Sequence, residues 1–286
     1  MTEVTFVLPN MSDIRPQRGG LSSRLDFARD LGCGYIEIPC DFIKNGGEVE
    51  RTGLEMGSPL TPAAIAGLYD AETGPAPLPY ILHTEPSLPR MDGCGLRMQA
   101  ALRWYDADWT EKLVAMIVGV SERLNAPPAA VEIHPGDRRN GDGDVIRGMA
   151  TIQAAFEDAF GTAPAVLLEN RTEQFIRDGR SIDRFWNQLL SAASGLAEDC
   201  GIVLDVSQLF TVTGTRFLAN LAAIPPDAIR ALHIHTRHGT PTPADRIPWP
   251  EVFALVRRLD RPVLVNPEVM HLNQAAATIA FCRERL

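Results

Sequence analysis

Short runs rich in Val, Ile and Leu alternate along this chain with longer stretches of helical periodicity. The β-type runs are residues 4–9, 35–40, 80–84, 130–134, 165–169, 202–205, 231–235 and 262–266. The helical stretches are residues 21–32, 61–72, 109–125, 145–160, 181–199, 215–224, 249–260 and 271–285. Apolar strands that alternate with amphipathic helices pair in parallel and are covered by those helices, so few folds accommodate the pattern.

Eight such units in 286 residues predict one (β/α)8 TIM barrel, a single domain over residues 1–286 with its active site at the C-terminal ends of the strands. The alternative is an open doubly wound sheet, but no GxGxxG or GxxxxGKS loop follows any predicted strand. Two long loops, residues 41–60 and 85–108, follow the second and third strands. We expect them to be either lids over a pocket or surface insertions.

Charge and polarity exclude several classes of partner. The net charge of −9 disfavours a nucleic-acid backbone or an anionic membrane, since both attract clustered Lys and Arg. The longest apolar stretch, residues 113–120, is far below the roughly 18 residues of a membrane span, and the N-terminus has no basic signal segment. Five scattered cysteines without a CxxC pair indicate neither a disulfide framework nor a thiolate zinc site. We expect a cytoplasmic protein with a small-molecule substrate, and leave homo-oligomerisation open.

Histidines and carboxylates end most of the predicted strands, where a barrel brings them to one mouth. Buried charges are costly when they are unpaired, and a divalent cation between them removes that cost. Mixed His and Asp/Glu ligands suit Zn, Mn, Fe or Co, with one or two ions per chain. The candidate ligands are His83, His134, Glu169, Asp205 and His233. His235 has the same strand parity as His233, so spacing alone does not decide which of the two binds metal.

Five strand-end motifs carry a resemblance to a known family: Leu82-His83-Thr-Glu-Pro86, Ile133-His134-Pro-Gly136, Leu168-Glu169-Asn170, Leu204-Asp205 and Leu232-His233. They resemble the xylose isomerase-like TIM-barrel superfamily, which includes sugar isomerases and epimerases, and most closely its endonuclease IV (AP endonuclease family 2) branch. The resemblance spans nearly the whole chain. It implies that His83, His134 and Glu169 hold one metal ion, and that Glu169 bridges to a second ion held by Asp205, His233 and a strand-eight carboxylate.

The chain departs from the family pattern in three places. Gln208 stands where the family has a His three residues after the strand-six Asp. Asp245-Arg246-Ile247 replaces the Asp-Arg-His of the endonucleases, so the third metal of their trinuclear site is expected to be absent or impaired. On strand eight the superfamily's Glu falls at Asn266, with Glu268 one strand period further. Either Glu268 reaches back to the site or Asn266 is a weaker ligand.

We expect a metal-dependent isomerase or epimerase that acts on a small sugar-like or hydroxy-carbonyl compound. The cation polarises the carbonyl, and Glu169 and Glu268 serve as the acid/base pair as well as metal ligands. Arg171 or Arg237 could clamp a substrate carboxylate or phosphate. Trp109, in the segment that leads into the third helix, could wall the pocket or pack between helices.

Three alternatives stay open at this stage. The first is a phosphodiester hydrolase that resembles endonuclease IV and uses two cations. The second is a multinuclear iron enzyme with oxidative chemistry on the same barrel. The third is a non-catalytic barrel that binds a small ligand, because Gln208, Asn266 and Ile247 are what decay of an ancestral metal site would leave.

Overall fold

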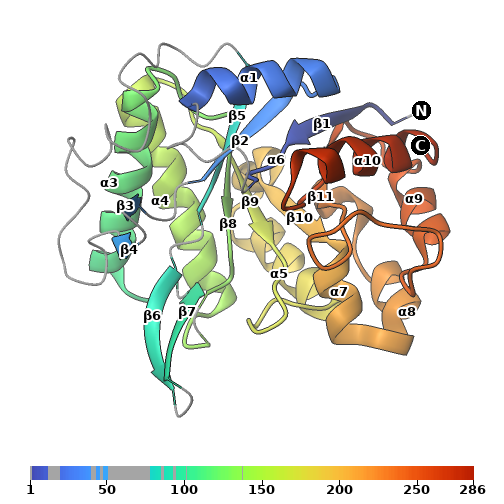
Figure 1. Cartoon of the computed structure of the whole chain (residues 1–286). Coiled ribbons are helices and arrows are strands. Elements are labelled where there is room, and N and C mark those ends of the chain that lie inside the picture. Colours follow the sequence, from blue (N-terminus) through green and yellow to red (C-terminus); the bar gives the residue numbers. More distant parts are fainter. Residues whose placement is uncertain are drawn as a thin grey trace.

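The structure is a computed structural model that describes residues 2–11, 20–39, 43–45, 48–50, 78–84, 87–92, 95–100, 102–136 and 138–286. Eight parallel strands close into a barrel in the order β1-β12-β11-β10-β9-β8-β5-β2 (Figure 1). They are β1 (Val4–Leu8), β2 (Tyr35–Pro39), β5 (Tyr80–His83), β8 (Ala130–Ile133), β9 (Ala165–Glu169), β10 (Gly201–Asp205), β11 (Ile229–His233) and β12 (Val263–Asn266). The predicted (β/α)8 barrel is confirmed, and each strand lies within about two residues of its predicted position.

Helices follow the strands and cover the barrel (Figure 1). The described ones are α1 (Gly20–Leu31), α3 (Ala107–Arg123), α4 (Asp142–Phe160), α5 (Gly179–Ala192), α6 (Ser194–Asp199), α7 (Val206–Thr213), α8 (Phe217–Ala222), α9 (Trp249–Val256) and α10 (Leu272–Arg283). The helix expected over residues 61–72 lies outside the described residues. None of the described helices has both the length and the apolar character that crossing a membrane requires.

Two helical predictions were wrong in their boundaries. The stretch 181–199 is two helices, because the backbone of Ala193 leaves the helical region (φ −155°, ψ 66°) between α5 and α6. The stretch 215–224 misses α7, which begins directly after β10. Asp205 ends that strand and also caps the helix by accepting a hydrogen bond from the backbone N–H of Gln208, so no loop separates the two elements.

The two segments expected to be long loops contain hairpins. Strands β3 (Ile43–Asn45) and β4 (Glu48–Glu50) pair antiparallel, as do β6 (Ser87–Asp92) and β7 (Gly95–Ala100). The second hairpin projects from the body of the molecule (Figure 1). The sequence between its strands is Gly93-Cys94, and a glycine that opens a two-residue connection is typical of tight hairpins, a signal that the prediction of loops overlooked. Whether these segments act as lids stays a prediction.

The barrel interior has an apolar layer below a polar one. The apolar layer consists of Val7, Ile81, Ala130, Leu167, Val203 and Ala231, with Tyr35 and Leu264 packed against it. Side chains two residues apart on a strand point the same way, so the position two residues later forms the next layer. That layer consists of Glu37, His83, Glu132, Glu169, Asp205, His233 and Asn266, all of them buried. The strand register therefore gathers seven polar side chains at the C-terminal end of the barrel.

Candidate metal centre

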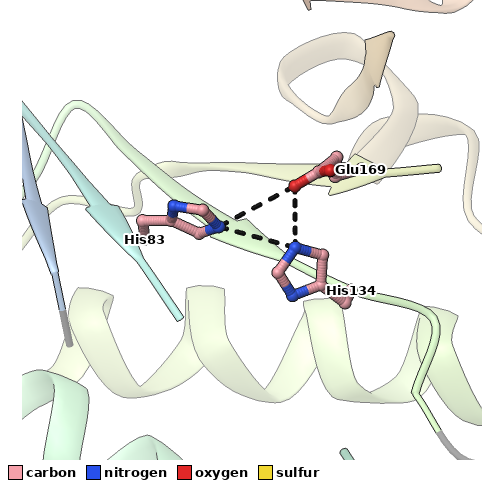
Figure 2. Close-up of side chains that lie close together, drawn as sticks. All are labelled: His83, His134 and Glu169. Carbon is pink, nitrogen blue, oxygen red and sulfur yellow. Dashed lines mark hydrogen bonds and ion pairs between the residues drawn. The ribbon is translucent and has the colours of Figure 1, made fainter. Parts of the chain in front are cut away.

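Three side chains from neighbouring strands form a tight triangle at the top of the barrel (Figure 2). His83 Nε2 lies 3.4 Å from His134 Nε2 and 3.8 Å from Glu169 Oε2, and the latter two atoms are 2.7 Å apart. A point equidistant from three atoms with these separations is about 2.0 Å from each, which matches zinc–nitrogen bonds of roughly 2.0–2.1 Å. The triangle thus has the dimensions of a facial set of metal ligands.

His83 is oriented by a buried carboxylate. Its Nδ1 lies 2.6 Å from Glu37 Oε1, while Glu37 Oε2 accepts hydrogen bonds from the backbone N–H of Asn10 at 3.0 Å and from Asn266 Nδ2 at 2.8 Å. Burial pushes the pKa of Glu37 upward, but His83, together with His233 and the hydrogen bond from Asn266, holds that pKa below its ordinary value. The ionised Glu37 accepts the Nδ1 hydrogen, which leaves the Nε2 lone pair of His83 for a metal ion.

His134 is held by the loop that follows it. Its backbone carbonyl accepts a hydrogen bond from Trp104 Nε1 at 2.9 Å. Asn140 Nδ2 donates to the carbonyl oxygens of Pro135 and Leu102, each at 2.9 Å, which ties this loop to the segment before α3. The residues of the His-Pro-Gly motif therefore serve to fix the backbone from which the imidazole projects.

Gly136 is required by that loop, so we expect Gly136→Ala to destabilise the protein by roughly 2–4 kcal/mol. Its φ of +80° disfavours any side chain, and a Cβ at this position would overlap the carbonyl oxygen of Leu102. Gly161 is the matched control, because its φ is +68° but nothing lies within 4 Å of an added Cβ. Urea unfolding should show a markedly smaller loss for Gly161→Ala than for Gly136→Ala. Equal losses would mean that the overlap is relieved at no cost.

A second cluster lies beside the triangle. His233 Nδ1 is 3.4 Å from Glu268 Oε2 and 3.9 Å from Glu169 Oε2, and ligand atoms of Asp205, His233 and Glu268 lie within 4.8 Å of one another. Three buried atoms here, Glu169 Oε1, His233 Nδ1 and Glu268 Oε2, have no hydrogen-bond partner among the described residues. Buried polar atoms are rarely left unsatisfied, so this donor set fits a cation that takes their lone pairs.

Asn170 locks the two strand ends that carry Glu169 and Asp205. Its Oδ1 accepts a hydrogen bond from the backbone N–H of Asp205 at 2.9 Å, and its Nδ2 donates to the Asp205 carbonyl at 3.1 Å. The backbone N–H and C=O of Asp205, at the end of β10, are thus both hydrogen-bonded by the side chain of Asn170, which follows β9. The Asn of the Leu-Glu-Asn motif thus has a structural explanation, since it fixes the spacing between the two carboxylates.

Glu132 is a site residue that the sequence analysis missed. It is buried on β8, with Oε1 3.1 Å from His233 Nε2 and 3.8 Å from His83 Nε2. Burial raises the pKa of Glu132 above its ordinary value despite both histidines. The signal was available, because Glu132 precedes His134 by one strand period and so has the same parity. Glu132 Oε1 has no hydrogen-bond partner among the described residues, so Glu132 acts on His233 through the charge of this ion pair.

The electrostatics of the cluster favour a cation. Burial raises the pKa of Glu169, but His134, together with His233 and Arg171, holds that pKa well below the ordinary value. Burial lowers the pKa of His233, but Glu132 and Glu268 outweigh it and hold that pKa well above the ordinary value. The carboxylates therefore stabilise positive charge between them, whether as protons on the imidazoles or as a bound metal ion.

The structure distinguishes the two alternatives for strand eight, in which either Glu268 or Asn266 is the metal ligand. Asn266 at the end of β12 donates to Glu37, and its Nδ2 lies 3.5 Å from His233 Nε2. Glu268 turns back two residues later, where its backbone N–H donates to the Asn266 carbonyl at 3.0 Å. The carboxylate that reaches the second cluster is thus that of Glu268, and Asn266 supports the first cluster through Glu37.

Gln208 and Asp245 make hydrogen bonds that organise loops. Gln208 Oε1 accepts from the backbone N–H and the hydroxyl of Thr172, at 3.2 and 2.6 Å. Asp245 accepts from Thr236 Oγ1 and from the backbone N–H of Thr242, both at 2.7 Å. Neither is in a described group of candidate metal ligands. Their role in metal binding stays a prediction that no described contact supports.

The three residues predicted to bind substrate lie in different environments. Arg171 Nη1 is 3.8 Å from Glu169 Oε1, so it borders the cluster. Arg237 is exposed in the turn after β11. Trp109 is buried at the start of α3, where its ring meets Trp104 edge-on at a centroid distance of 6.1 Å. Of the two interpretations of Trp109, packing between helices agrees with this position, and a contact with substrate stays a prediction.

Comparison with known proteins shows the fold. No family model matches the chain, and no curated protein matches it. Among solved structures, D-allulose 3-epimerase from Methylomonas sp. is 13% identical with a TM-score of 0.60, covering 100% of this chain and 99% of that one. D-psicose 3-epimerase from Clostridium cellulolyticum H10 is 13% identical with a TM-score of 0.58, covering 100% and 99%. Endonuclease IV from Thermus thermophilus is 17% identical with a TM-score of 0.52, covering 99% and 98%. The chain therefore shares the TIM-barrel fold of these structures.

Proposed function

We propose that this protein is a metal-dependent isomerase or epimerase of a small sugar-like or hydroxy-carbonyl compound. The observation that carries the proposal is a pair of carboxylates, Glu169 and Glu268, each with a buried oxygen that has no hydrogen-bond partner among the described residues. Glu268 Oε2 lies 3.4 Å from Nδ1 of His233, a candidate metal ligand, and the other oxygen of Glu169, Oε2, lies 3.9 Å from the same nitrogen. A carboxylate oxygen that accepts no hydrogen bond can take a proton from the substrate. A neighbouring cation polarises the substrate carbonyl and so makes the proton on the adjacent carbon easier to remove. The similar structures that are sugar epimerases support the same class of chemistry.

Each residue has a defined role in this proposal. A bound divalent ion would supply polarisation of the substrate carbonyl, held by Asp205 and His233 together with the two glutamates. One glutamate takes the proton from the carbon next to the carbonyl, so that the C–H electron pair forms a C=C bond and the carbonyl π pair moves to oxygen. The second glutamate, already protonated, gives a proton to that carbon from its other side, the C=O bond re-forms, and the carbon is inverted. If the former carbonyl carbon is protonated instead, the adjacent hydroxyl gives up its proton to the carbonyl oxygen, becomes the new carbonyl, and the compound is isomerised.

The finer assignments belong to the same proposal. We propose Zn, Mn, Fe or Co as the metal, with one ion in each cluster, because both clusters combine imidazole with carboxylate ligands. We propose Arg171 and Arg237 as contacts for an anionic or hydroxyl group of the substrate. The remaining assignments are a single domain over residues 1–286, a cytoplasmic location, a small molecule rather than nucleic acid as the partner, and a homo-oligomer as the assembly to test.

The test is proton exchange at carbon. Protein loaded with Mn, Co or Zn would be incubated in deuterated water with a panel of ketohexoses, aldoses and hydroxy-ketones, followed by NMR. We expect epimer or isomer formation with deuterium at the carbon next to the carbonyl, reduced by about 10²–10⁴-fold in Glu268→Gln. The control Glu157→Gln changes an exposed glutamate on α4 and should leave the rate unchanged. Metal-loaded protein that exchanges no proton in any of these compounds would contradict the proposal.

Hydrolysis of a phosphodiester is the second candidate, and the His83–His134–Glu169 triangle favours it. Two adjoining clusters that share Glu169 are the arrangement used by two-metal hydrolases. Release of p-nitrophenol from bis(p-nitrophenyl) phosphate would measure this activity directly. Turnover that requires both ions, together with no exchange at carbon, would replace the first candidate by the second.

A further inference from the structure

Arg171 stands beside Glu169, one of the two glutamates of the proposed acid/base pair. Its Nη1 lies 3.8 Å from Glu169 Oε1, a fully buried oxygen without a hydrogen-bond partner among the described residues. Arg171 follows the C-terminal end of β9 by two residues, and its side chain is 23% exposed. The guanidinium therefore lies between the buried cluster and the end of the barrel from which a substrate approaches.

The distance between Arg171 and Glu169 is longer than in a structural arginine–carboxylate pair. Such pairs form two parallel hydrogen bonds of about 2.7–2.9 Å. The chain contains one of them, in which Arg184 donates from Nε to Asp142 Oδ2 at 2.7 Å and from Nη2 to Oδ1 at 2.9 Å. Arg171 Nη1 and Glu169 Oε1 are too far apart for a hydrogen bond, so the guanidinium does not clamp this glutamate.

The backbone of Arg171 is fixed on both sides. Its N–H donates to the carbonyl oxygen of Ile176 at 3.1 Å, and its carbonyl oxygen accepts from the backbone N–H of Gln174 at 3.2 Å. The next residue, Thr172, donates from its backbone N–H and from its hydroxyl to Gln208 Oε1, which ties the loop to α7. The loop thus holds the Cα of Arg171 in a defined position, and this limits where its guanidinium can lie.

The other glutamate of the pair has different neighbours. Glu268 Oε2 lies 3.0 Å from Nε2 of the buried His235 and 3.4 Å from Nδ1 of His233. Among the ion pairs of the described residues, an arginine approaches Glu169, whereas only histidines approach Glu268. The permanent positive charge of a guanidinium is therefore on the Glu169 side of the pair.

The position of this charge indicates which substrate fits. A guanidinium has five N–H donors in a planar fork that matches a carboxylate, whereas a hydroxyl group needs no permanent charge for its recognition. Arg171 and Glu169 would contact substrate atoms from points 3.8 Å apart. In an acid whose carboxylate adjoins the carbonyl, the carbon that loses its proton and a carboxylate oxygen are about 3–4 Å apart, from ordinary bond lengths. A phosphate at the far end of a pentose or hexose is roughly twice as far from that carbon.

We propose that Arg171 is a specificity-determining residue and that the substrate is a small hydroxy-keto acid. The carboxylate of this acid binds Arg171, and the carbon that loses its proton lies beside Glu169. The inference rests on the proposed function and narrows its substrate class from hydroxy-carbonyl compounds in general to those with a carboxylate next to the carbonyl.

Two three-carbon compounds test the substrate class. Hydroxypyruvate and dihydroxyacetone are the same hydroxymethyl ketone, except that hydroxypyruvate has a carboxylate where dihydroxyacetone has a second CH2OH group. Deuterium exchange at the hydroxymethyl carbon would be followed by NMR with protein incubated with Zn, and corrected for exchange without protein. We expect kcat/KM for hydroxypyruvate to exceed that for dihydroxyacetone by about 100-fold. Equal values would overturn the inference and leave the proposed function standing.

Two matched variants test the residue. Arg171→Gln removes the charge and should lower the ratio of the two kcat/KM values, hydroxypyruvate over dihydroxyacetone, by about 10–100-fold, mainly through KM for the acid. The control Arg177→Gln removes the same charge from an exposed arginine of the same loop, whose backbone N–H donates to Ser181 Oγ, and should leave the ratio unchanged. A loss in Arg171→Gln that is equal for both compounds would make Arg171 a support for Glu169 and overturn its role in specificity.

Binding without turnover separates this inference from the proposed function. Glycerate is the hydroxy acid related to hydroxypyruvate, and glycerol lacks its carboxylate. Calorimetric titration of protein incubated with Zn should show glycerate binding that weakens about tenfold or more in Arg171→Gln and stays unchanged in Arg177→Gln, with no measurable binding of glycerol.

The outcomes of this titration are distinct. Glycerate bound through Arg171 by a protein that exchanges no proton in any compound would overturn the proposed function and keep the assignment of Arg171. Equal affinity of the parent and Arg171→Gln for glycerate would overturn that assignment. Tighter binding of glycerol 3-phosphate than of glycerate would replace the carboxylate by a phosphate and overturn the proposed substrate class.

Discussion

Replacing Glu169 with alanine is expected to empty both metal positions and to lower turnover by about 10³-fold or more. Glu169 Oε2 lies 2.7 Å from His134, 3.8 Å from His83 and 3.9 Å from His233, so a single carboxylate serves both clusters. Its removal leaves imidazoles without the negative charge that favours a cation between them. Mass spectrometry measures the metal content, and a rate assay with a compound that the unmutated protein converts measures turnover.

The matched control for this experiment is Glu157→Ala on α4. That side chain is exposed, so both metal content and turnover should stay at the parental level. Circular dichroism should show that Glu169→Ala keeps its fold, because the apolar layer beneath the cluster is untouched. A folded Glu169→Ala protein that retains two ions per chain and full turnover would remove Glu169 from the centre of the site.

Removing metal is expected to lower the melting temperature by roughly 10 °C. A ligand that binds only the folded state at about 1,000 times its Kd stabilises that state by about 4 kcal/mol, and each kcal/mol corresponds to about 2–4 °C in a chain of this size. The physical reason is that Glu132 and Glu169 are buried close together beside His233, and their repulsion is relieved by the ion. Calorimetry before and after chelation, and again after Zn or Mn is restored, measures the shift.

Two comparisons sharpen this result. Glu169→Ala should melt at one temperature with or without added metal, since it has lost the site. Mg, which prefers shells made of oxygen atoms alone, should restore less stability than Zn. A parent protein whose melting temperature is the same with and without metal would mean that the buried carboxylates are satisfied by protons alone.

The strands and most of the cluster could be predicted because both depend on short-range pattern. Parity along a strand decides which residues point inward, and parallel pairing brings the C-terminal ends of all strands together. His83 and Glu169 end β5 and β9, and His134 directly follows β8 between them, so their convergence follows from the order of the strands. The spacing of hydrophobic residues reveals where the strands lie and which residues point inward, and this prediction requires no knowledge of side-chain conformation.

Glu132 was missed although its parity already points it inward, because its partner His233 faces it from another strand, β11. Two questions that the sequence left open depend on contacts between elements. The reach of Glu268 depends on a turn after β12, because its backbone N–H bonds to Asn266 and redirects the chain. The choice for Trp109 between a pocket wall and helix packing depends on the position of Trp104, which its ring meets edge-on.

The apolar layer under the cluster fills the interior of the barrel. Val7, Ile81 and Val203 are among the residues that pack directly beneath the polar ring. Of the two ends of the barrel, a substrate would therefore reach Glu169 from the C-terminal one. A product that is still bound at this end blocks the next substrate, so product release can limit the turnover rate.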